Sequence, residues 1–160
     1  MKKTTALALV SSLFLLAACD SAGTDSGAAG GAGGADGTGS GILGRTTDGV
    51  SVGDRVYFDY NSDLITAEGQ STLEHQAQWL KQYTNVSVAI EGHCDERGTR
   101  EYNIALGERR ASAVKNYLVG LGVDGSRIST ISYGKERPAV VGHDESSWSQ
   151  NRRGVTVIAN

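Results

Sequence analysis

A glycine-rich segment limits what this chain can fold into. Ten of the 25 residues from Asp20 to Gly44 are glycine, and apolar residues able to form a core begin only near Val50. A segment with almost nothing to bury cannot offset the entropy of ordering its backbone, so we expect a flexible tether over residues 19–49. About 110 of the 160 residues remain for folding. That length suits one small domain, expected over residues 50–160, and excludes a two-domain enzyme.

The first 18 residues have the layout of a secretory signal peptide. Lys2 and Lys3 precede an apolar run over residues 6–18, which is too short to span a bilayer. The run ends in Leu-Ala-Ala-Cys, which resembles the lipobox of bacterial lipoproteins, where cleavage leaves the cysteine as the acylated first residue. We therefore predict export and a lipid anchor on Cys19.

The charge balance argues against a polyanionic partner. The whole chain has 18 acidic and 15 basic residues, a net charge of -3. From Val50 onward the count is 14 acidic against 12 basic residues, or -2. Without a net positive field, the domain is not expected to bind nucleic acid.

The remaining residues alternate between strand-like and helix-like patterns. Thr66 is a candidate N-cap for an amphipathic helix, and Thr99 for a second helix that runs to about Leu121 and is closed by Gly122. The expected order is β-α-β-α-β-β, an α/β (α+β) sandwich with a four-stranded mixed sheet and both helices on one face. The expected strands are 56–60, 86–90, 128–133 and 155–159, and the apolar positions of the first helix are Leu73, Ala77, Leu80 and Tyr83.

The second helix has an arginine on its core-facing side. At 100° per residue, the apolar stripe through Val114 and Leu118 leads back to Leu106 and also to Arg110, whereas Arg109 turns toward solvent. An unpaired buried guanidinium is strongly destabilising. Arg110 is therefore expected to face an anion.

The nearest anions lie in the charged loop 91–99, just before that helix. The loop joins a strand end to a helix start, where α/β folds commonly bind ligands. Asp95 could thus face Arg110. Two arrangements remain open from the residues alone. One is a closed structural salt bridge, and the other is an open pair in which Asp95 binds the ammonium of a zwitterion and Arg110 its carboxylate.

The segment 91–111, EGHCDERGTREYNIALGERRA, closely resembles the signature of the OmpA-like C-terminal domain family in the form found in peptidoglycan-associated lipoproteins. The resemblance continues through residues 132–138, 142–145 and 151–153. It covers about 105 residues, from Val56 to the end of the chain. The lipobox and the tether also match this family.

The resemblance implies non-covalent binding of peptidoglycan stem peptides through meso-diaminopimelate, whose side chain ends in an ammonium and a carboxylate. It also implies no enzymatic activity and no cofactor. By motif position, Asp95 would hold the ammonium and Arg110 the carboxylate. The further ligand-binding residues implied are Arg97 and Leu106, which would line the site, and Tyr60 and Asn61.

A partner and a location follow from the same resemblance. The partner implied is the periplasmic β-propeller protein TolB of the Tol complex, whose binding surface would overlap that for peptidoglycan. The location implied is the outer membrane, with the domain in the periplasm and a role in cell division and envelope integrity. Asp20 is a departure, because an aspartate after the lipidated cysteine resembles the inner-membrane retention signal of enteric bacteria.

Two other interpretations of the sequence remain open. A periplasmic metal-dependent hydrolase could use His93, Cys94 and Asp95, although their spacing matches no common metal motif. A protein-only interaction module would need no peptidoglycan, and Trp148, in a polar loop, is then a candidate partner contact. Cys94 has no partner for a disulfide if Cys19 is lipidated, and we expect a buried free thiol.

Overall fold

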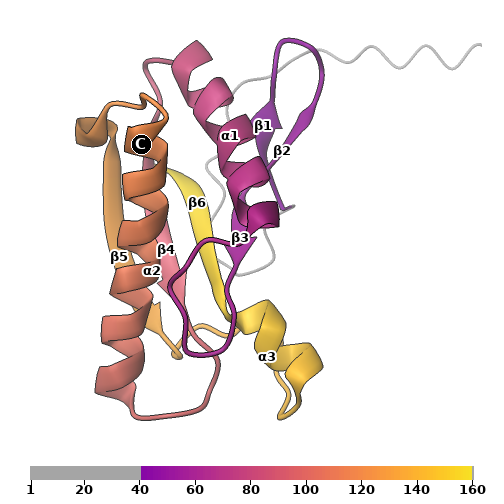
Figure 1. The fold of residues 1–160 in the computed structure, drawn as a ribbon, viewed down its shortest axis with the longest axis vertical. Coiled ribbons are helices and arrows are strands. Elements are labelled where there is room, and N and C mark those ends of the chain that lie inside the picture. The colour runs from indigo at the N-terminus through magenta and orange to yellow at the C-terminus, as the bar shows by residue number, and fades with distance from the viewer. Residues whose placement is uncertain (1–40, 160) are drawn as a thin grey trace, which may run out of the picture. The chain divides into compact units, whose positions relative to one another are not determined.

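The computed structural model describes residues 41–159 (Figure 1). The signal peptide, Cys19, Asp20 and the tether up to residue 40 lie outside the described residues, so what was expected of them stays a prediction. None of the helices within residues 41–159 is long and apolar enough to cross a membrane.

Four strands form one mixed sheet in the order β3-β6-β4-β5 (Figure 1). Strands β4 and β5 are parallel, whereas β6 is antiparallel to both β3 and β4. A parallel pair needs a crossover connection, which α2 provides. The predicted four-stranded mixed sheet is confirmed. Its strands are β3 (Arg55–Tyr57), β4 (Ser87–His93), β5 (Ile128–Gly134) and β6 (Arg153–Ala159).

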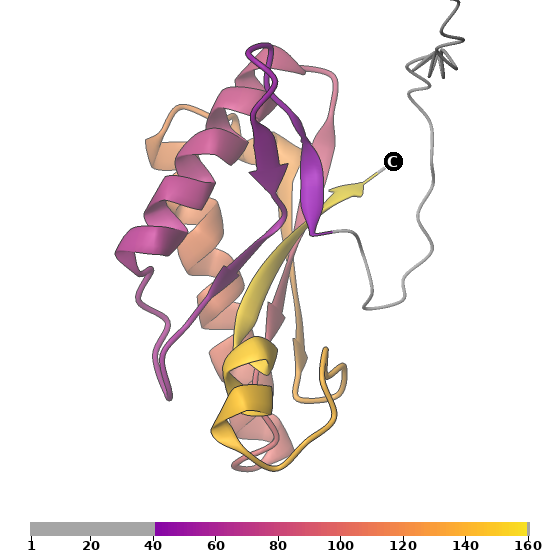
Figure 2. The same cartoon turned by 90° about the vertical axis from the view of Figure 1, so that its right-hand side faces the viewer.

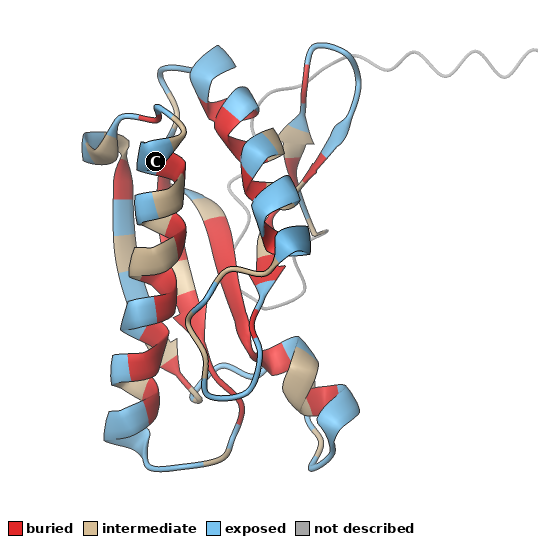
Figure 3. Cartoon of the chain, viewed as in Figure 1, coloured by how far each residue is buried: buried red, intermediate tan, exposed pale blue. Residues whose placement is uncertain are grey.

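Helices α1 (Ala67–Gln82) and α2 (Arg100–Gly120) cover the same face of this sheet (Figure 2). Their buried residues lie on the sides turned toward the strands (Figure 3). Thr66 and Thr99 are the N-caps, as predicted. Each threonine hydroxyl accepts a hydrogen bond from the backbone N–H three residues later, over 3.1 and 3.2 Å respectively.

The apolar stripe of α1 is confirmed except at its end. Leu73, Ala77 and Leu80 are buried in the core. Tyr83 was expected there too, but it is the C-cap residue and is 40% exposed. Its ring lies against that of Trp79, with 5.0 Å between the centroids. The helix ends at Gln82, so Tyr83 lies just beyond its last helical residue.

A small hairpin precedes the sheet, formed by β1 (Ile42–Arg45) and β2 (Ser51–Gly53). Most of the hairpin falls within the expected tether, so the boundary predicted at residue 50 is too late. Leu43 and Val52 are buried in the same hydrophobic core as the two helices. The glycine-rich composition gave no indication that these two apolar side chains are buried and so stabilise the hairpin.

One glutamine connects the hairpin to both α1 and the sheet. Gln76 is fully buried in α1. Its side-chain nitrogen donates to the carbonyl of Gly53 over 2.7 Å, and its side-chain oxygen accepts from the Thr156 hydroxyl over 2.8 Å. These bonds satisfy a polar side chain that would otherwise be destabilising in a core.

Two short helices were not expected from the sequence. One is the 3-10 helix Gly125–Arg127, and the other is α3 (Glu145–Asn151), capped by Asp144. Helix α3 lies at the end of the sheet where β4 ends and β6 begins (Figure 1). The loop over residues 58–66 and the start of α2 reach the same end, and together they position the pocket described next.

Candidate functional site

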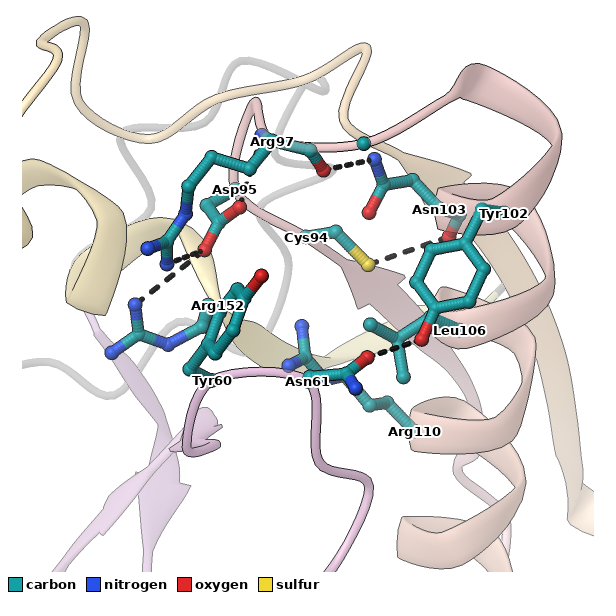
Figure 4. A pocket seen from close by; sticks show the side chains of 11 residues that line it. Tyr60, Asn61, Cys94, Asp95, Arg97, Tyr102, Asn103, Leu106, Arg110 and Arg152 are labelled. Atoms are coloured by element: carbon teal, nitrogen blue, oxygen red, sulfur yellow. Dashed lines mark hydrogen bonds and ion pairs between the residues drawn. The ribbon is translucent and has the colours of Figure 1, made fainter.

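One pocket brings together all six residues expected to bind a ligand. Its volume is about 70 Å³, which fits the end of a side chain rather than a whole peptide. The expected residues lie around it as Figure 4 shows. They are Tyr60, Asn61, Asp95, Arg97, Leu106 and Arg110, and the remaining lining residues are Cys94, Gly98, Tyr102, Asn103 and Arg152.

Asp95 is the acidic residue of this pocket and is almost fully buried. Its carboxylate accepts a hydrogen bond from the Arg97 backbone N–H over 3.1 Å and pairs with Arg97 Nη2 over 2.5 Å. Arg152 Nη1 lies 3.5 Å from the same carboxylate. Burial opposes ionisation, but the bonds from Arg97 outweigh it and hold the pKa of Asp95 below its ordinary value.

Arg110 is fully buried, as the helical stripe predicted. Among the described residues, the acceptors of its side-chain hydrogen bonds are backbone carbonyls rather than the anion that was expected. Its guanidinium donates to three backbone carbonyls, those of Ser62 over 2.8 Å, His93 over 2.8 Å and Asp59 over 3.1 Å. Backbone carbonyl dipoles therefore stabilise this buried guanidinium, for which the sequence had predicted an anion. Burial lowers the pKa of Arg110 from its ordinary value.

The closed salt bridge between Asp95 and Arg110 is also wrong. The ion pairs of Asp95 are with Arg97 and Arg152. Each terminal guanidinium nitrogen carries two N–H groups, and the carbonyls use one on each terminal nitrogen of Arg110. Asp95 and Arg110 project into the cavity from different walls (Figure 4), which is the open arrangement considered from the sequence.

Arg97 lies between two aromatic rings at the rim. Its guanidinium carbon is 4.2 Å from the ring centroid of Tyr60 and 4.0 Å from that of Trp148. Trp148 is oriented by a hydrogen bond from its indole nitrogen to Glu96 over 2.9 Å, and Glu96 also pairs with His143 over 2.7 Å. Trp148 therefore packs on Arg97, a lining residue of the pocket, and the sequence did not predict this placement.

The opposite rim is formed by Asn61 and Tyr102. Asn61 has a positive φ of 52°, a conformation that asparagine adopts more readily than most residues. Its side-chain oxygen accepts a hydrogen bond from the Tyr102 hydroxyl (Figure 4). Asn61 thus connects the loop over residues 58–66 to the first turn of α2.

Sequence reasoning missed Arg152 and Asn103 as lining residues. Arg152 donates from Nε to the carbonyl of Phe58 over 2.9 Å and from Nη2 to Glu145 over 2.5 Å. Its buried Nη1 has no hydrogen-bond partner in the part of the chain that the structure describes. Asn103 was visible on the buried stripe of the second helix, and its amide donates to the carbonyl of Arg97 over 2.8 Å. The only signal for Arg152 was its place in the 151–153 motif.

The residues weighed as metal ligands do not form a metal site. Within residues 41–159 no group of three histidine, cysteine or acidic side chains could hold an ion. His93 stacks on Tyr133, with ring centroids 5.5 Å apart, and its Nε2 lies 3.4 Å from Glu91 without hydrogen-bond alignment. Cys94 is a buried free thiol, as expected, and burial raises its pKa.

Comparisons with known proteins agree with this architecture. The OmpA family model matches residues 57–152. A peptidoglycan-associated lipoprotein of Haemophilus influenzae is 44% identical over 155 residues, which cover 93% of this chain and 94% of that protein. One from Rhizobium meliloti is 62% identical over 109 residues, which are 68% of this chain but only 62% of that protein. The chain thus matches less than two thirds of the Rhizobium protein.

Solved structures show the same fold. The crystal structure of the peptidoglycan-associated lipoprotein from Burkholderia pseudomallei is 45% identical, with a TM-score of 0.65, and the match covers 66% of this chain and 90% of that one. The C-terminal domain of Helicobacter pylori MotB, at 22% identity and a TM-score of 0.62, shares the fold over 67% of this chain and 84% of that one. The chain belongs to the OmpA family and, within it, to the peptidoglycan-associated lipoproteins.

Proposed function

We propose that this domain binds peptidoglycan non-covalently through the meso-diaminopimelate of its stem peptides. The observation that carries the proposal is the placement of Asp95 and Arg110 on different walls of one small pocket (Figure 4). The terminal ammonium of diaminopimelate would bind Asp95, and its terminal carboxylate the unused N–H groups of Arg110. Arg97 and Leu106 line the site, and Tyr60 and Asn61 form part of its rim.

The expected binding free energy suits an anchor that binds peptidoglycan reversibly. A hydrogen bond to a charged group contributes about 1.5 to 3 kcal/mol, so two or three of them support specific binding while still allowing release. No covalent step is required. The OmpA family is non-enzymatic, in agreement with the prediction that this chain is not an enzyme.

The wider setting follows from the family. We propose a lipoprotein anchored in the outer membrane through Cys19, which connects that membrane to the peptidoglycan wall as part of the Tol-Pal system in cell division and envelope integrity. The names of the relatives support a lipid-anchored envelope protein. We propose the outer membrane because the family resemblance implies it, and not the inner-membrane retention that Asp20 suggests.

TolB is the protein partner we propose, at a surface that overlaps the pocket. Tyr60 and Tyr102, which line the pocket, are 63% and 44% exposed, and Leu64, in the same loop as Tyr60, is 78% exposed. Exposed apolar residues around a polar site favour protein docking. Titrating TolB with and without a diaminopimelate peptide tests the overlap. Simultaneous binding with undiminished affinity would contradict it.

The binding proposal is tested by calorimetry on the mature chain carrying Cys19→Ser. The ligands are a stem peptide with diaminopimelate and its lysine analogue, which lacks the terminal carboxylate. We expect binding of the first and at least about tenfold weaker binding of the second, a difference of about 1.4 kcal/mol. Asp95→Asn should also abolish binding while leaving the fold intact. Equal binding of both peptides would show that Arg110 holds no ligand carboxylate.

A further inference from the structure

Asp95 already has a cationic partner within the protein. The Arg97 guanidinium lies 2.5 Å from the carboxylate, at the position that the proposed function gives to the ligand ammonium. We infer that Arg97 is an internal competitor for the ligand, so that diaminopimelate binds only by displacing it. This inference rests on the proposed function and adds a regulation of the same site.

Displacement is required by charge and space. The Asp95 carboxylate is buried, and Arg152 Nη1 lies 3.5 Å from it on another side. A ligand ammonium added beside two guanidinium groups would meet like charges at close range in a poorly solvated site. One of the arginines has to leave for the ammonium to bind.

Arg97 is the arginine that can leave. Arg110 donates to three backbone carbonyls, and Arg152 donates to the carbonyl of Phe58. Within residues 41–159 the guanidinium of Arg97, by contrast, donates a hydrogen bond only to the Asp95 carboxylate, and its buried Nε has no hydrogen-bond partner there. Its side chain is also 30% exposed, compared with 7% for Arg152.

A second carboxylate lies within reach of the displaced side chain. Arg97 Nη2 is 3.9 Å from Glu145 Oε2, which is largely exposed at the start of α3. A small rotation of the guanidinium therefore exchanges a buried anion for an exposed one. The ligand ammonium would replace Arg97 at Asp95, and the number of ion pairs at Asp95 would be conserved.

Trp148 sets how strongly Arg97 is held. The guanidinium carbon of Arg97 lies 4.0 Å from the ring centroid of Trp148 and 4.2 Å from that of Tyr60. Such cation–π contacts favour the docked position. The hydrogen bond from Trp148 to Glu96 holds the indole in place. Trp148 thus acts as a positioning residue for Arg97 and needs no contact with the ligand.

The test compares two arginine substitutions in the mature chain carrying Cys19→Ser. Arg97→Met removes the competitor and keeps the length of the side chain. Arg100→Met removes the same charge from an exposed arginine that pairs with Glu136 outside the pocket. With the diaminopimelate stem peptide, we expect Arg97→Met to bind about tenfold more tightly than wild type, and Arg100→Met to bind equally. Trp148→Leu should give a smaller gain in the same direction.

The outcomes separate this inference from the proposed function. Weaker or unchanged binding by Arg97→Met, with binding by wild type, would overturn the competitor role and leave the proposed function standing. No binding by wild type or Arg97→Met would overturn both. An independent check is the NMR chemical shift of the Arg97 guanidinium, which the rings of Tyr60 and Trp148 should displace from its usual value. We expect the ligand to abolish this displacement. A usual chemical shift in the free protein would contradict the docked position of Arg97.

Discussion

The backbone of Gly92 in β4 lies directly against that of Gly107 in α2. A side chain built on Gly92 would overlap the carbonyl group of Gly107, and one built on Gly107 would overlap the Ser132 hydroxyl. This contact brings the first half of α2 onto the sheet, with Asn103, Leu106 and Arg110 facing it. We expect Gly107→Ala to lower the free energy of unfolding by about 3 kcal/mol, because strand and helix are forced apart. Urea unfolding measures the loss.

Gly120 is the matched control in the same helix. A side chain there would meet nothing within 4 Å, and the residue is helical. Gly120→Ala should therefore stabilise the protein by about 0.5 to 1 kcal/mol, since alanine loses less backbone entropy. Equal effects of the two substitutions would show that the close contact is unimportant.

Arg110 is predicted to be essential for stability as well as for binding. In Arg110→Met three backbone carbonyls lose their donor. Each lost hydrogen bond costs about 1 kcal/mol, so we expect the free energy of unfolding to fall by about 3 kcal/mol. Thermal unfolding checks this. Arg109→Met, one residue earlier and exposed, should change stability by less than about 0.5 kcal/mol. For this reason Asp95→Asn is the cleaner test of ligand binding.

His93 is expected to make stability fall as the pH falls. Burial lowers the pKa of His93 from its ordinary value, with Arg153 and Arg137 adding to the effect and Glu91 opposing it. Below about pH 6.5 the unfolded chain binds a proton at His93 that the folded protein does not bind. Each further decrease of one pH unit then lowers the free energy of unfolding by up to about 1.4 kcal/mol. Urea unfolding at pH 7.5 and 5.5 should show a smaller drop for His93→Gln than for wild type.

His143 is expected to titrate in the opposite sense. Its bond to Glu96 raises the pKa of His143 above the ordinary 6.5. The ion pair is therefore fully formed below pH 6.5 and is lost as the pH rises through the raised value. An NMR titration should show this, and Glu96→Gln should bring the pKa of His143 back toward 6.5. An unchanged value in Glu96→Gln would mean that the pair does not form in solution.

Local signals were enough to predict most of the fold. Thr66 and Thr99 cap helices through hydrogen bonds to residues three positions away, so the sequence pattern contains both partners. Arg110 was placed on the buried side of α2 by helical periodicity, and the structure confirms it. These predictions depended only on neighbours along the chain.

Contacts between distant segments were not predictable in the same way. The carbonyls that bind Arg110 belong to Asp59, Ser62 and His93. Every residue has a backbone carbonyl, so the sequence does not indicate which ones accept from Arg110. Gly44 looked like tether composition, yet a side chain there would overlap the ring of Trp79. The glycine allows the hairpin to approach α1, which only the folded chain reveals.

The hairpin also determines how the domain carries a mechanical load. In the proposed function the membrane pulls on the chain before Gly41, and the first bonds to be loaded join Gly41 to Asp54 and Ile42 to Gly53. These lie at the open end of the hairpin, so tension would break its ladder one bond at a time. Freeing 12 residues would lengthen the connection by about 40 Å. The hairpin would thus unfold and lengthen the connection before the force reaches the sheet and the loop after β4 that contains Asp95.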